Sequence, residues 1–302
     1  MDNLTHSFAG ALLAQMGLKK LSGRATSTLV IAANIPDIDA VASVLGTQSL
    51  AIRRGITHGP IALALLPLVL TGLVLLWNRW RPVDQPVRFW PLLLCAYVGT
   101  LSHPALDWLN SYGIRLLEPF SSTWYAGDTL FIVDVWIWIT LVGCWWWSRR
   151  REKRGGDWQR PAWLGFAAIG GYIFANGLVT GHAERTTARM VARDGAAPDL
   201  VVANPVPIAF WRRTMLWRDS EFYRSGRYSV GSGVKLDEPA LPLPSRAVIE
   251  AEARGRPDVR AFLFWSRMPI VVYRDRKPFL ADQRFNSELT RGQFLVPLTS
   301  RP

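Results

Sequence analysis

Residues 89–110 read FWPLLLCAYVGTLSHPALDWLN, an apolar run whose last third carries a histidine and an aspartate. A helix rises 1.5 Å per residue, so roughly 20 such residues cross the hydrocarbon core of a bilayer. Three further runs of similar length and character cover residues 58–77, 130–147 and 161–180. We therefore expect a mainly α-helical, polytopic membrane bundle with about four full spans.

Two shorter apolar segments precede these runs, at residues 4–18 and 25–45. The second is interrupted by Pro36, Asp37 and Asp39. A short or interrupted segment does not form a full membrane span by itself, so both are interpreted as short or re-entrant helices.

The composition indicates two unlike halves. Hydrophobic residues make up 49% of the chain, which includes 15 tryptophans, and the mean hydropathy is +0.11. This is too apolar for an average soluble domain and too charged for a chain that is membrane throughout. We expect a membrane domain at residues 1–181 and an extramembrane domain at residues 182–302. The latter holds runs rich in β-branched and aromatic residues at 261–265, 270–273 and 294–296, which predict a small β-rich domain.

Basic residues predict the orientation. One set of connections between the apolar segments is rich in lysine and arginine, whereas the alternate set holds only Arg53, Arg54 and Arg115. The rich set is expected to be cytoplasmic, which places the chain in the inner membrane and residues 182–302 in the periplasm. The opposite orientation keeps a weak claim because the C-terminal part is itself basic. The rich set comprises Lys19, Lys20, Arg24, Arg79, Arg81, Arg88, Arg149, Arg150, Arg151, Lys153, Arg154 and Arg160.

The formal charge of +12 is explained by this topology, so nucleic acid is not an expected partner. The two cysteines, Cys95 and Cys144, lie inside apolar runs without paired spacing. They are interpreted as small buried hydrophobic residues, not as a disulfide or a thiolate metal site.

Three of the four histidines, His6, His58 and His103, lie in or beside apolar segments. Placing an ionisable group at such depth in a membrane costs free energy, so each of these histidines is a candidate functional residue. His103 and Asp107 are four residues apart, so they share one face of a helix and can converge on one cation. The structural alternative is a hydrogen-bonded pair within the helix.

Under the predicted topology six side chains fall at one membrane face, although only lysine and arginine positions set that topology. Asp37 and Asp39 could otherwise be turn residues, and His6 and His58 could belong to helix starts. A shared metal site requires the three imidazoles to lie within about 10 Å of one another. The candidate metal ligands are His6, Asp37, Asp39, His58, His103 and Asp107.

Histidine and aspartate ligands suit zinc first, with manganese or iron as alternatives. One ion would use three or four of the six groups, and all six could hold two. Such an ion activates water and polarises an ester, amide or phosphoryl oxygen. A carboxylate that does not bind the metal, Asp39 or Asp107, would then act as general base. Arg53 and Arg54 are interpreted as a solvated interfacial pair, with an anionic substrate group as the alternative ligand.

Five motifs together resemble the YdjM-type family of inner-membrane proteins. They are DNLTHS at 2–7, NIPDID at 34–39, RGITH at 54–58, HPALDWLNSYG at 103–113 and FIVD at 131–134, in the family's order. The family is described as predicted membrane-bound metal-dependent hydrolases, some of them under LexA control, and the resemblance implies the same for residues 1–150. One departure is Arg53, where members usually carry a histidine, and it bears on whether one or two ions bind.

The leading hypothesis is a hydrolase at the outer surface of the inner membrane, acting on a lipid-linked or phosphate-ester substrate that can reach a site at the depth of the membrane interface. The alternative is a non-enzymatic metal-binding membrane protein or a transporter. A third reading is a structural protein with a vestigial site. Transporters often contain repeated halves with broken helices, and the sequence shows no such repeat.

Overall fold

The computed structural model describes residues 1–193, 195, 198–219 and 221–299. It divides into two compact units. Unit 1 comprises residues 1–39 and 54–177, and unit 2 comprises residues 40–53 and 178–302.

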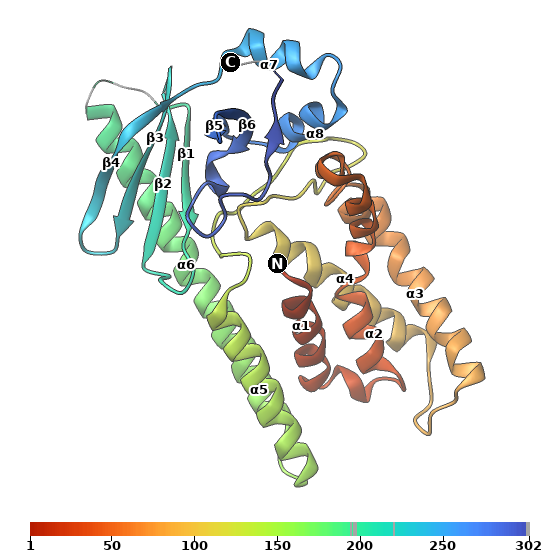
Figure 1. Cartoon of the computed structure of the whole chain (residues 1–302). Coiled ribbons are helices and arrows are strands. Elements are labelled where there is room, and N and C mark those ends of the chain that lie inside the picture. Colours follow the sequence, from red (N-terminus) through yellow and green to blue (C-terminus); the bar gives the residue numbers. More distant parts are fainter. Residues whose placement is uncertain (194, 196–197, 220, 300–302) are drawn as a thin grey trace. The chain divides into compact units, whose positions relative to one another are not determined.

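Unit 1 is helical, which confirms the mainly α-helical prediction. Helix α1 contacts α2, α4 and α5, while α4 also contacts α2 and α3 (Figure 1). Two short 3-10 helices, η1 (Leu18–Lys20) and η3 (Ile56–His58), also belong to this unit, and a longer one, η2 (Ile35–Ala51), begins in unit 1 and continues into unit 2 from Ala40. The α-helices are α1 (Asn3–Gln15), α2 (Ala25–Ala32), α3 (Pro60–Trp80), α4 (Phe89–Trp108), α5 (Val135–Lys153) and α6 (Gln159–Arg193), the last of which continues into unit 2.

Helices α3, α4 and α6 are each long and apolar enough to cross a membrane, and α2 with η2 adds a fourth if that bent pair is one span. Helix α5 differs from the run predicted at 130–147. It begins only at Val135, because the Asp134 carboxylate caps it by accepting hydrogen bonds from Trp136 N and Ile137 N at 3.0 and 3.1 Å. Its last turns carry Arg149–Arg151, which makes it more charged than the other three.

Two glycines let α2 approach its neighbours closely. A Cβ atom at Gly10 of α1 would lie 2.6 Å from the carbonyl oxygen of Leu29, and one at Gly99 of α4 would lie 2.9 Å from the same oxygen. Small residues at such crossings are typical of packed membrane helices. The close approach brings the end of α2, and therefore the start of η2, beside α4.

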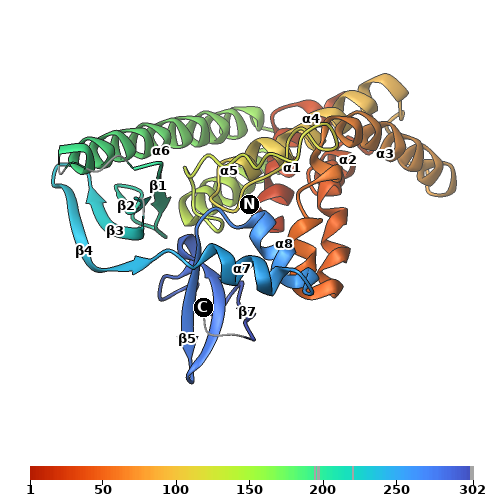
Figure 2. The same ribbon diagram turned by 90° about the horizontal axis from the view of Figure 1, so that it is seen from above.

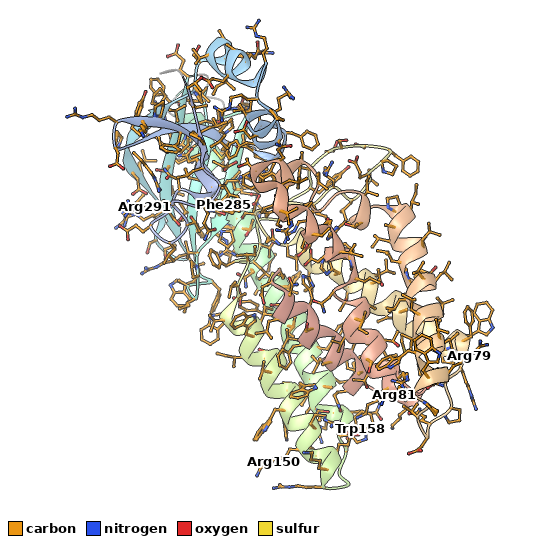
Figure 3. The ribbon with its side chains drawn as sticks, turned by 45° about the vertical axis from the view of Figure 1, so that its right-hand side comes forward. Arg79, Arg81, Arg150, Trp158, Phe285 and Arg291 are labelled. Atoms are coloured by element: carbon orange, nitrogen blue, oxygen red, sulfur yellow. The ribbon has the colours of Figure 1, made fainter. Side chains whose placement is uncertain are left out.

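Basic side chains gather at one end of unit 1. Figure 3 shows Arg79, Arg81, Arg150 and Trp158 at that end. His6 lies in the first turn of α1 and Asp107 in the last turn of α4, at the opposite ends of these helices from Lys19 and Arg88. The candidate site and the basic residues therefore occupy opposite ends of the helical unit.

Unit 2 contains two antiparallel sheets, which confirms the small β domain at the C-terminus. The first, in the order β1-β2-β3-β4, lies against the C-terminal half of α6 (Figure 2), where Ala183 and Val191 pack against Met215 and Trp217. The second sheet has the order β5-β6-β7. The elements are β1 (Leu200–Pro205), β2 (Arg212–Arg218), β3 (Phe222–Ser229), β4 (Gly233–Pro242), α7 (Arg246–Ala253), α8 (Pro257–Trp265), β5 (Pro269–Arg274), β6 (Lys277–Asp282), η4 (Gln283–Phe285) and β7 (Val296–Pro297).

The strand predicted at 261–265 is wrong, because these residues form the end of α8. Pro257 starts that helix, and the buried side chains Val259, Phe262 and Trp265 recur every three residues, which is a helical period. The run at 270–273 is a strand within β5, as predicted. From the run at 294–296, only Val296 enters a strand.

Candidate metal centre

Local sequence features place each histidine of the centre. The Asp2 carboxylate caps α1 by accepting hydrogen bonds from Leu4 N and Thr5 N at 3.0 and 3.1 Å, which sets His6 in the first turn. His58 ends η3, and Pro60 starts α3 directly after it, at the position where a helix best accepts proline. His103 and Asp107 lie one turn apart on α4 and point the same way.

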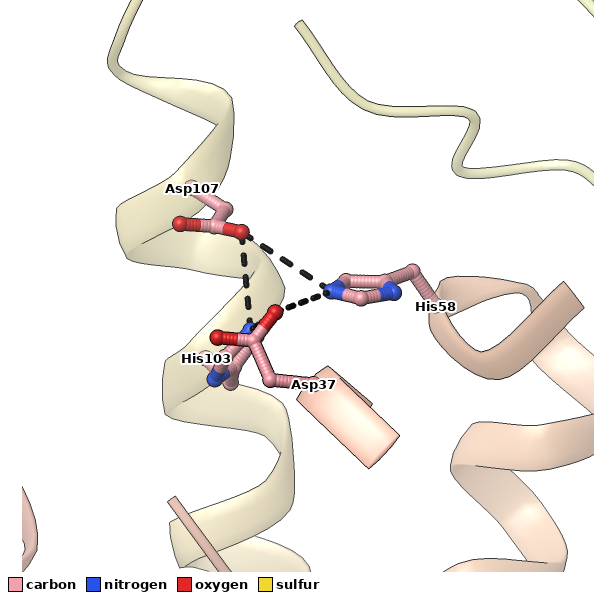
Figure 4. Close-up of side chains that lie close together, drawn as sticks. All are labelled: Asp37, His58, His103 and Asp107. Carbon is pink, nitrogen blue, oxygen red and sulfur yellow. Dashed lines mark ion pairs between the residues drawn. The ribbon is translucent and has the colours of Figure 1, made fainter. Parts of the chain in front are cut away.

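Pro36 places Asp37. It disfavours continuation of the preceding α2 helix through Ile35, so the chain changes course and starts η2. Asp37 then lies in the first turn of η2, with its side chain toward α4 (Figure 4).

Four side-chain atoms converge in Figure 4. His103 Nε2 lies 3.4 Å from Asp107 Oδ2 and 3.6 Å from Asp37 Oδ1. His58 Nε2 lies 3.8 and 3.9 Å from the same two oxygens. Four ligands bound about 2.1 Å from a tetrahedral zinc ion lie about 3.4 Å from one another. The four separations quoted are 3.4 to 3.9 Å, and all four atoms lie within 4.8 Å of one another, which leaves room for one divalent ion between them.

The convergent atoms lack ordinary partners. His58, His103 and Asp107 are 0% exposed. Within the described residues, Asp37 Oδ1, His58 Nε2, His103 Nε2 and Asp107 Oδ2 form no ordinary hydrogen bond, and besides the two imidazoles Asp107 Oδ2 pairs with Arg54 Nε at 3.0 Å. Buried polar atoms left this way cost free energy, so a cluster of them indicates a ligand site.

The other ring nitrogen of each histidine is held by the protein. His103 Nδ1 donates to the carbonyl oxygen of Ala33 at 2.7 Å. His58 Nδ1 donates to Thr57 Oγ1 at 2.9 Å, and this hydroxyl donates to Asp39 Oδ2 at 2.8 Å. These contacts leave the Nε2 lone pair of each ring directed into the cluster, the arrangement by which proteins orient metal-binding histidines.

His6 and Asp39 lie beside the four convergent residues. The His6 ring stacks on His103 with centroids 3.8 Å apart, and its Nε2 lies 3.2 Å from Asp107 Oδ1. Asp39 Oδ2 lies 3.4 Å from His58 Nδ1 and accepts from Arg54 N at 2.7 Å. The centroids of His58 and His103 are 5.0 Å apart. All six predicted side chains thus meet, well inside the 10 Å that a shared site requires.

Arg54 was not predicted to belong to the cluster. The expectation of a solvated residue is wrong for it, because Arg54 is only 4% exposed and its Nη2 donates to Asp107 Oδ1 at 3.2 Å. Its Nη1 donates to Asn110 Oδ1 at 3.0 Å and to the carbonyl oxygen of Gly113 at 3.3 Å, and its guanidinium lies over the Tyr112 ring. The signal was present in the sequence, since RGITH and DWLNSYG supply both sides of this contact.

The charged groups of the cluster also suit a bound metal cation. The guanidinium of Arg54 pairs with Asp107, the backbone N–H of Arg54 donates to Asp39 Oδ2, and the α-amino group of Met1 contacts Asp107. Asp37, Asp39 and Asp107 bring three carboxylates together in a medium where charge is weakly screened, and carboxylate oxygens suit a divalent cation. The group Asp37, His58, His103 and Asp107 could hold a metal ion.

The apolar helices and the buried His/Asp cluster define a multi-pass membrane protein with a potential metal centre. Residues 1–183 match the family model of the YdjM inner membrane protein, and the chain belongs to that family. Neither a curated protein nor a solved structure gives a significant match to the chain. The family match contains every residue of the cluster and ends before the β-sheets of unit 2.

Proposed function

We propose that the chain is a membrane-bound hydrolase that uses one divalent metal ion, zinc first and manganese or iron as alternatives, held by Asp37, His58, His103 and Asp107. The observation that carries the proposal is the convergence of buried nitrogen and oxygen atoms that lack hydrogen bonds. Two imidazoles and two carboxylates are a ligand set used by all three metals.

A divalent ion in such a site makes bound water acidic enough to react near neutral pH and polarises the oxygen of an ester, amide or phosphoryl group. The protein's own groups then have distinct tasks. Asp39 with Thr57 orients His58, and Arg54 fixes the Asp107 carboxylate. Asp107 is a ligand in this arrangement, so Asp39 is the one of the two predicted general bases that remains, and its buried Oδ1, which forms no hydrogen bond, could accept a proton.

We further propose that the cluster faces the periplasmic side of the inner membrane, with unit 2 on that side. Its location at the opposite end of unit 1 from Arg79, Arg81 and Arg150 supports this orientation, because arginines flanking membrane spans stay cytoplasmic. A substrate at this depth would be lipid-linked or would carry a phosphate ester at the membrane surface.

The test measures two properties of the full chain purified in detergent: its metal content and its hydrolytic activity. Elemental mass spectrometry should find about one mole of metal per mole of wild-type protein. The His103→Ala variant should lose this metal. The matched control is His182→Ala, because His182 is exposed and contacts the Tyr228 ring in unit 2, so this variant should retain the metal. Equal metal content in His103→Ala and wild type would refute the site.

Activity separates the two functional classes. Panels of ester, amide and phosphoester lipids in mixed micelles should reveal hydrolysis that disappears in His103→Ala and persists in His182→Ala. Stoichiometric metal without hydrolysis of any panel member would instead favour a non-enzymatic metal-binding protein or a transporter.

A further inference from the structure

A second feature of unit 1 is an apolar cavity of about 310 Å³ between α1, α4, α5 and α6. This volume lies at the lower end of the range for small-molecule sites, roughly 300–1,000 Å³. Its walls include Leu12 and Met16 of α1, Leu106 of α4, Leu141 of α5 and Ile173 of α6.

The cavity has no unsatisfied polar group to offer a ligand. Its two hydroxyl-bearing side chains are Thr5 and Ser102. Thr5 Oγ1 donates to Asp2 Oδ2 at 2.6 Å and accepts from Trp138 Nε1 at 2.9 Å, while Ser102 Oγ donates to the carbonyl oxygen of Gly99 at 2.7 Å. An occupant is therefore bound by apolar contact alone, and it must be hydrocarbon.

The cavity begins at the depth of the metal centre. Thr5 precedes His6 on α1, and Leu106 precedes Asp107 on α4, so adjacent faces of the same two helices serve the cavity and the cluster. The α1 lining continues to Met16, about 16 Å further along the helix axis at 1.5 Å per residue. A chain in the cavity would thus run along α1 into the membrane with its polar end near the cluster.

The cavity is open on the surface of α6. Phe166 is 50% exposed and Gly170 is exposed, and both line it. Because α6 is one of the helices able to cross a membrane, this surface faces lipid tails and not water. A lipid can enter from the side with its chain already in hydrocarbon.

We propose that this cavity binds one acyl or isoprenoid chain of a lipid whose polar group lies at the His/Asp cluster. This inference rests on the proposed function and specifies its substrate class as a lipid recognised by its chain. Both chain types are hydrocarbon, linear in an acyl chain and methyl-branched and unsaturated in an isoprenoid, so the test includes a probe for each.

Two neighbouring glycines of α6 provide a matched pair of variants. A Cβ at Gly170 or at Gly171 meets nothing within 4 Å, but only Gly170 lines the cavity. Gly170→Leu should place its side chain in the cavity, and Gly171→Leu should place an equal side chain outside it. Both replace a glycine inside a helix by a better helix former, so neither is expected to unfold the protein.

The experiment is photo-crosslinking in nanodiscs with a phospholipid or an isoprenoid phosphate that carries a diazirine in its chain. Crosslinks mapped by mass spectrometry should concentrate on the cavity residues of α1 and α5. Gly170→Leu should reduce them on the order of tenfold by displacing buried apolar contacts, whereas Gly171→Leu should leave them unchanged. Whichever probe labels more strongly identifies the chain type.

Two results would overturn the proposal. One is equal labelling of these residues in Gly170→Leu and wild type. The other is labelling no stronger than that of Leu65 and Leu68, exposed residues of α3, which would mean bulk lipid only. Metal content is measured on the same samples and should not change in either glycine variant. The two proposals therefore fail differently. If the cavity proposal is wrong, lipid labelling fails while metal stays bound, and if the metal-centre proposal is wrong, wild type itself holds no metal.

Discussion

Two carboxylates with enclosed oxygen atoms, the buried Asp282 in unit 2 and the half-buried Asp37 in unit 1, have opposite surroundings. Asp282 is 1% exposed, and its oxygens accept hydrogen bonds from Ser266 Oγ at 2.6 Å, Arg284 Nη2 at 2.7 Å and Arg284 Nε at 2.8 Å. Asp37 Oδ1 is equally enclosed but forms no hydrogen bond and faces the Nε2 atoms of His58 and His103.

The difference separates a structural charge from a candidate ligand. A buried ion pair with every oxygen satisfied needs nothing further, whereas an unpartnered buried oxygen beside ring nitrogens is costly until a cation binds. Removing a carboxylate should therefore have opposite consequences in the two units, and each prediction below tests that contrast.

The largest effect is expected from Asp282→Ala. The buried guanidinium of Arg284 loses its counter-charge, and breaking such a pair typically costs about 3–5 kcal/mol. Hydrogen exchange by mass spectrometry should show lost protection in β5 and β6. The control is Asp199→Ala, which breaks the more exposed ion pair with Arg218 and should change protection little. Unchanged exchange in Asp282→Ala would contradict the structural role.

Metal addition should give the next largest effect, confined to unit 1. Zinc at 100 times its dissociation constant stabilises the state that binds it by about 2.7 kcal/mol. The thermal unfolding of wild type in detergent should shift upward with zinc, and that of His103→Ala should not. Asp282→Ala, although less stable, should keep the full zinc response in the exchange of α4. A zinc response that His103→Ala retains would place the ion elsewhere.

Thr57→Val should have a smaller effect, on metal affinity. Valine keeps the shape of threonine but removes the hydroxyl that links His58 Nδ1 to Asp39. Loss of such an orienting contact typically weakens metal binding by about 10–100-fold. Competition with a zinc chelator measures the change, and Thr140→Val on α5 is the control with the same substitution away from the cluster. Equal affinities in the two variants would show that the hydroxyl does not orient His58.

Mild acid should have little effect on unit 2. Burial alone would raise the pKa of Asp282, but the charge and hydrogen bonds of Arg284 outweigh it and hold the pKa below its usual value. A carboxyl with a lowered folded pKa contributes its full stability above the unfolded value of about 3.9, and loses it as pH falls through the folded value. Protection of β6 should stay constant from neutral pH to about pH 5 and fall only in stronger acid. Asp282→Asn should remove that acid dependence.

The features of the candidate metal site that depend on the spacing of residues along the chain were predicted from the sequence. The shared face of His103 and Asp107 follows from helical geometry, and the proximity of the six side chains was predicted from the distribution of basic residues. Arg54 was missed because its partners Asn110 and Gly113 lie more than fifty positions away and its backbone has a positive φ of 52°, which no local pattern indicates. Only a contact between distant loops buries it.

The errors elsewhere have local causes. Residues 261–265 are apolar enough for a strand, but Pro257 and the three-residue spacing of buried side chains favour the helix α8. Helix α5 starts later than hydropathy predicts because the Asp134 cap sets its first residue, and hydropathy does not register hydrogen bonds. Apolar runs therefore predict α3, α4 and α6 as membrane-capable helices, but not the exact number of spans or the ends of the helices.

The smallest effect, and the most direct test of the contrast, is expected from Asp37→Asn in metal-free protein. Its Oδ1 atom lies 3.6 Å from His103 Nε2 and 3.9 Å from His58 Nε2, and it forms no hydrogen bond that the amide would lose. With chelator present, the thermal midpoint should stay within the range of a neutral surface substitution, about 0.5 kcal/mol, or rise. The zinc-induced stabilisation should disappear at the same time. Asp282→Asn should reverse both results, losing stability in chelator and keeping the zinc response. If Asp37→Asn destabilises the metal-free protein as strongly as Asp282→Asn does, Asp37 is a structural charge too.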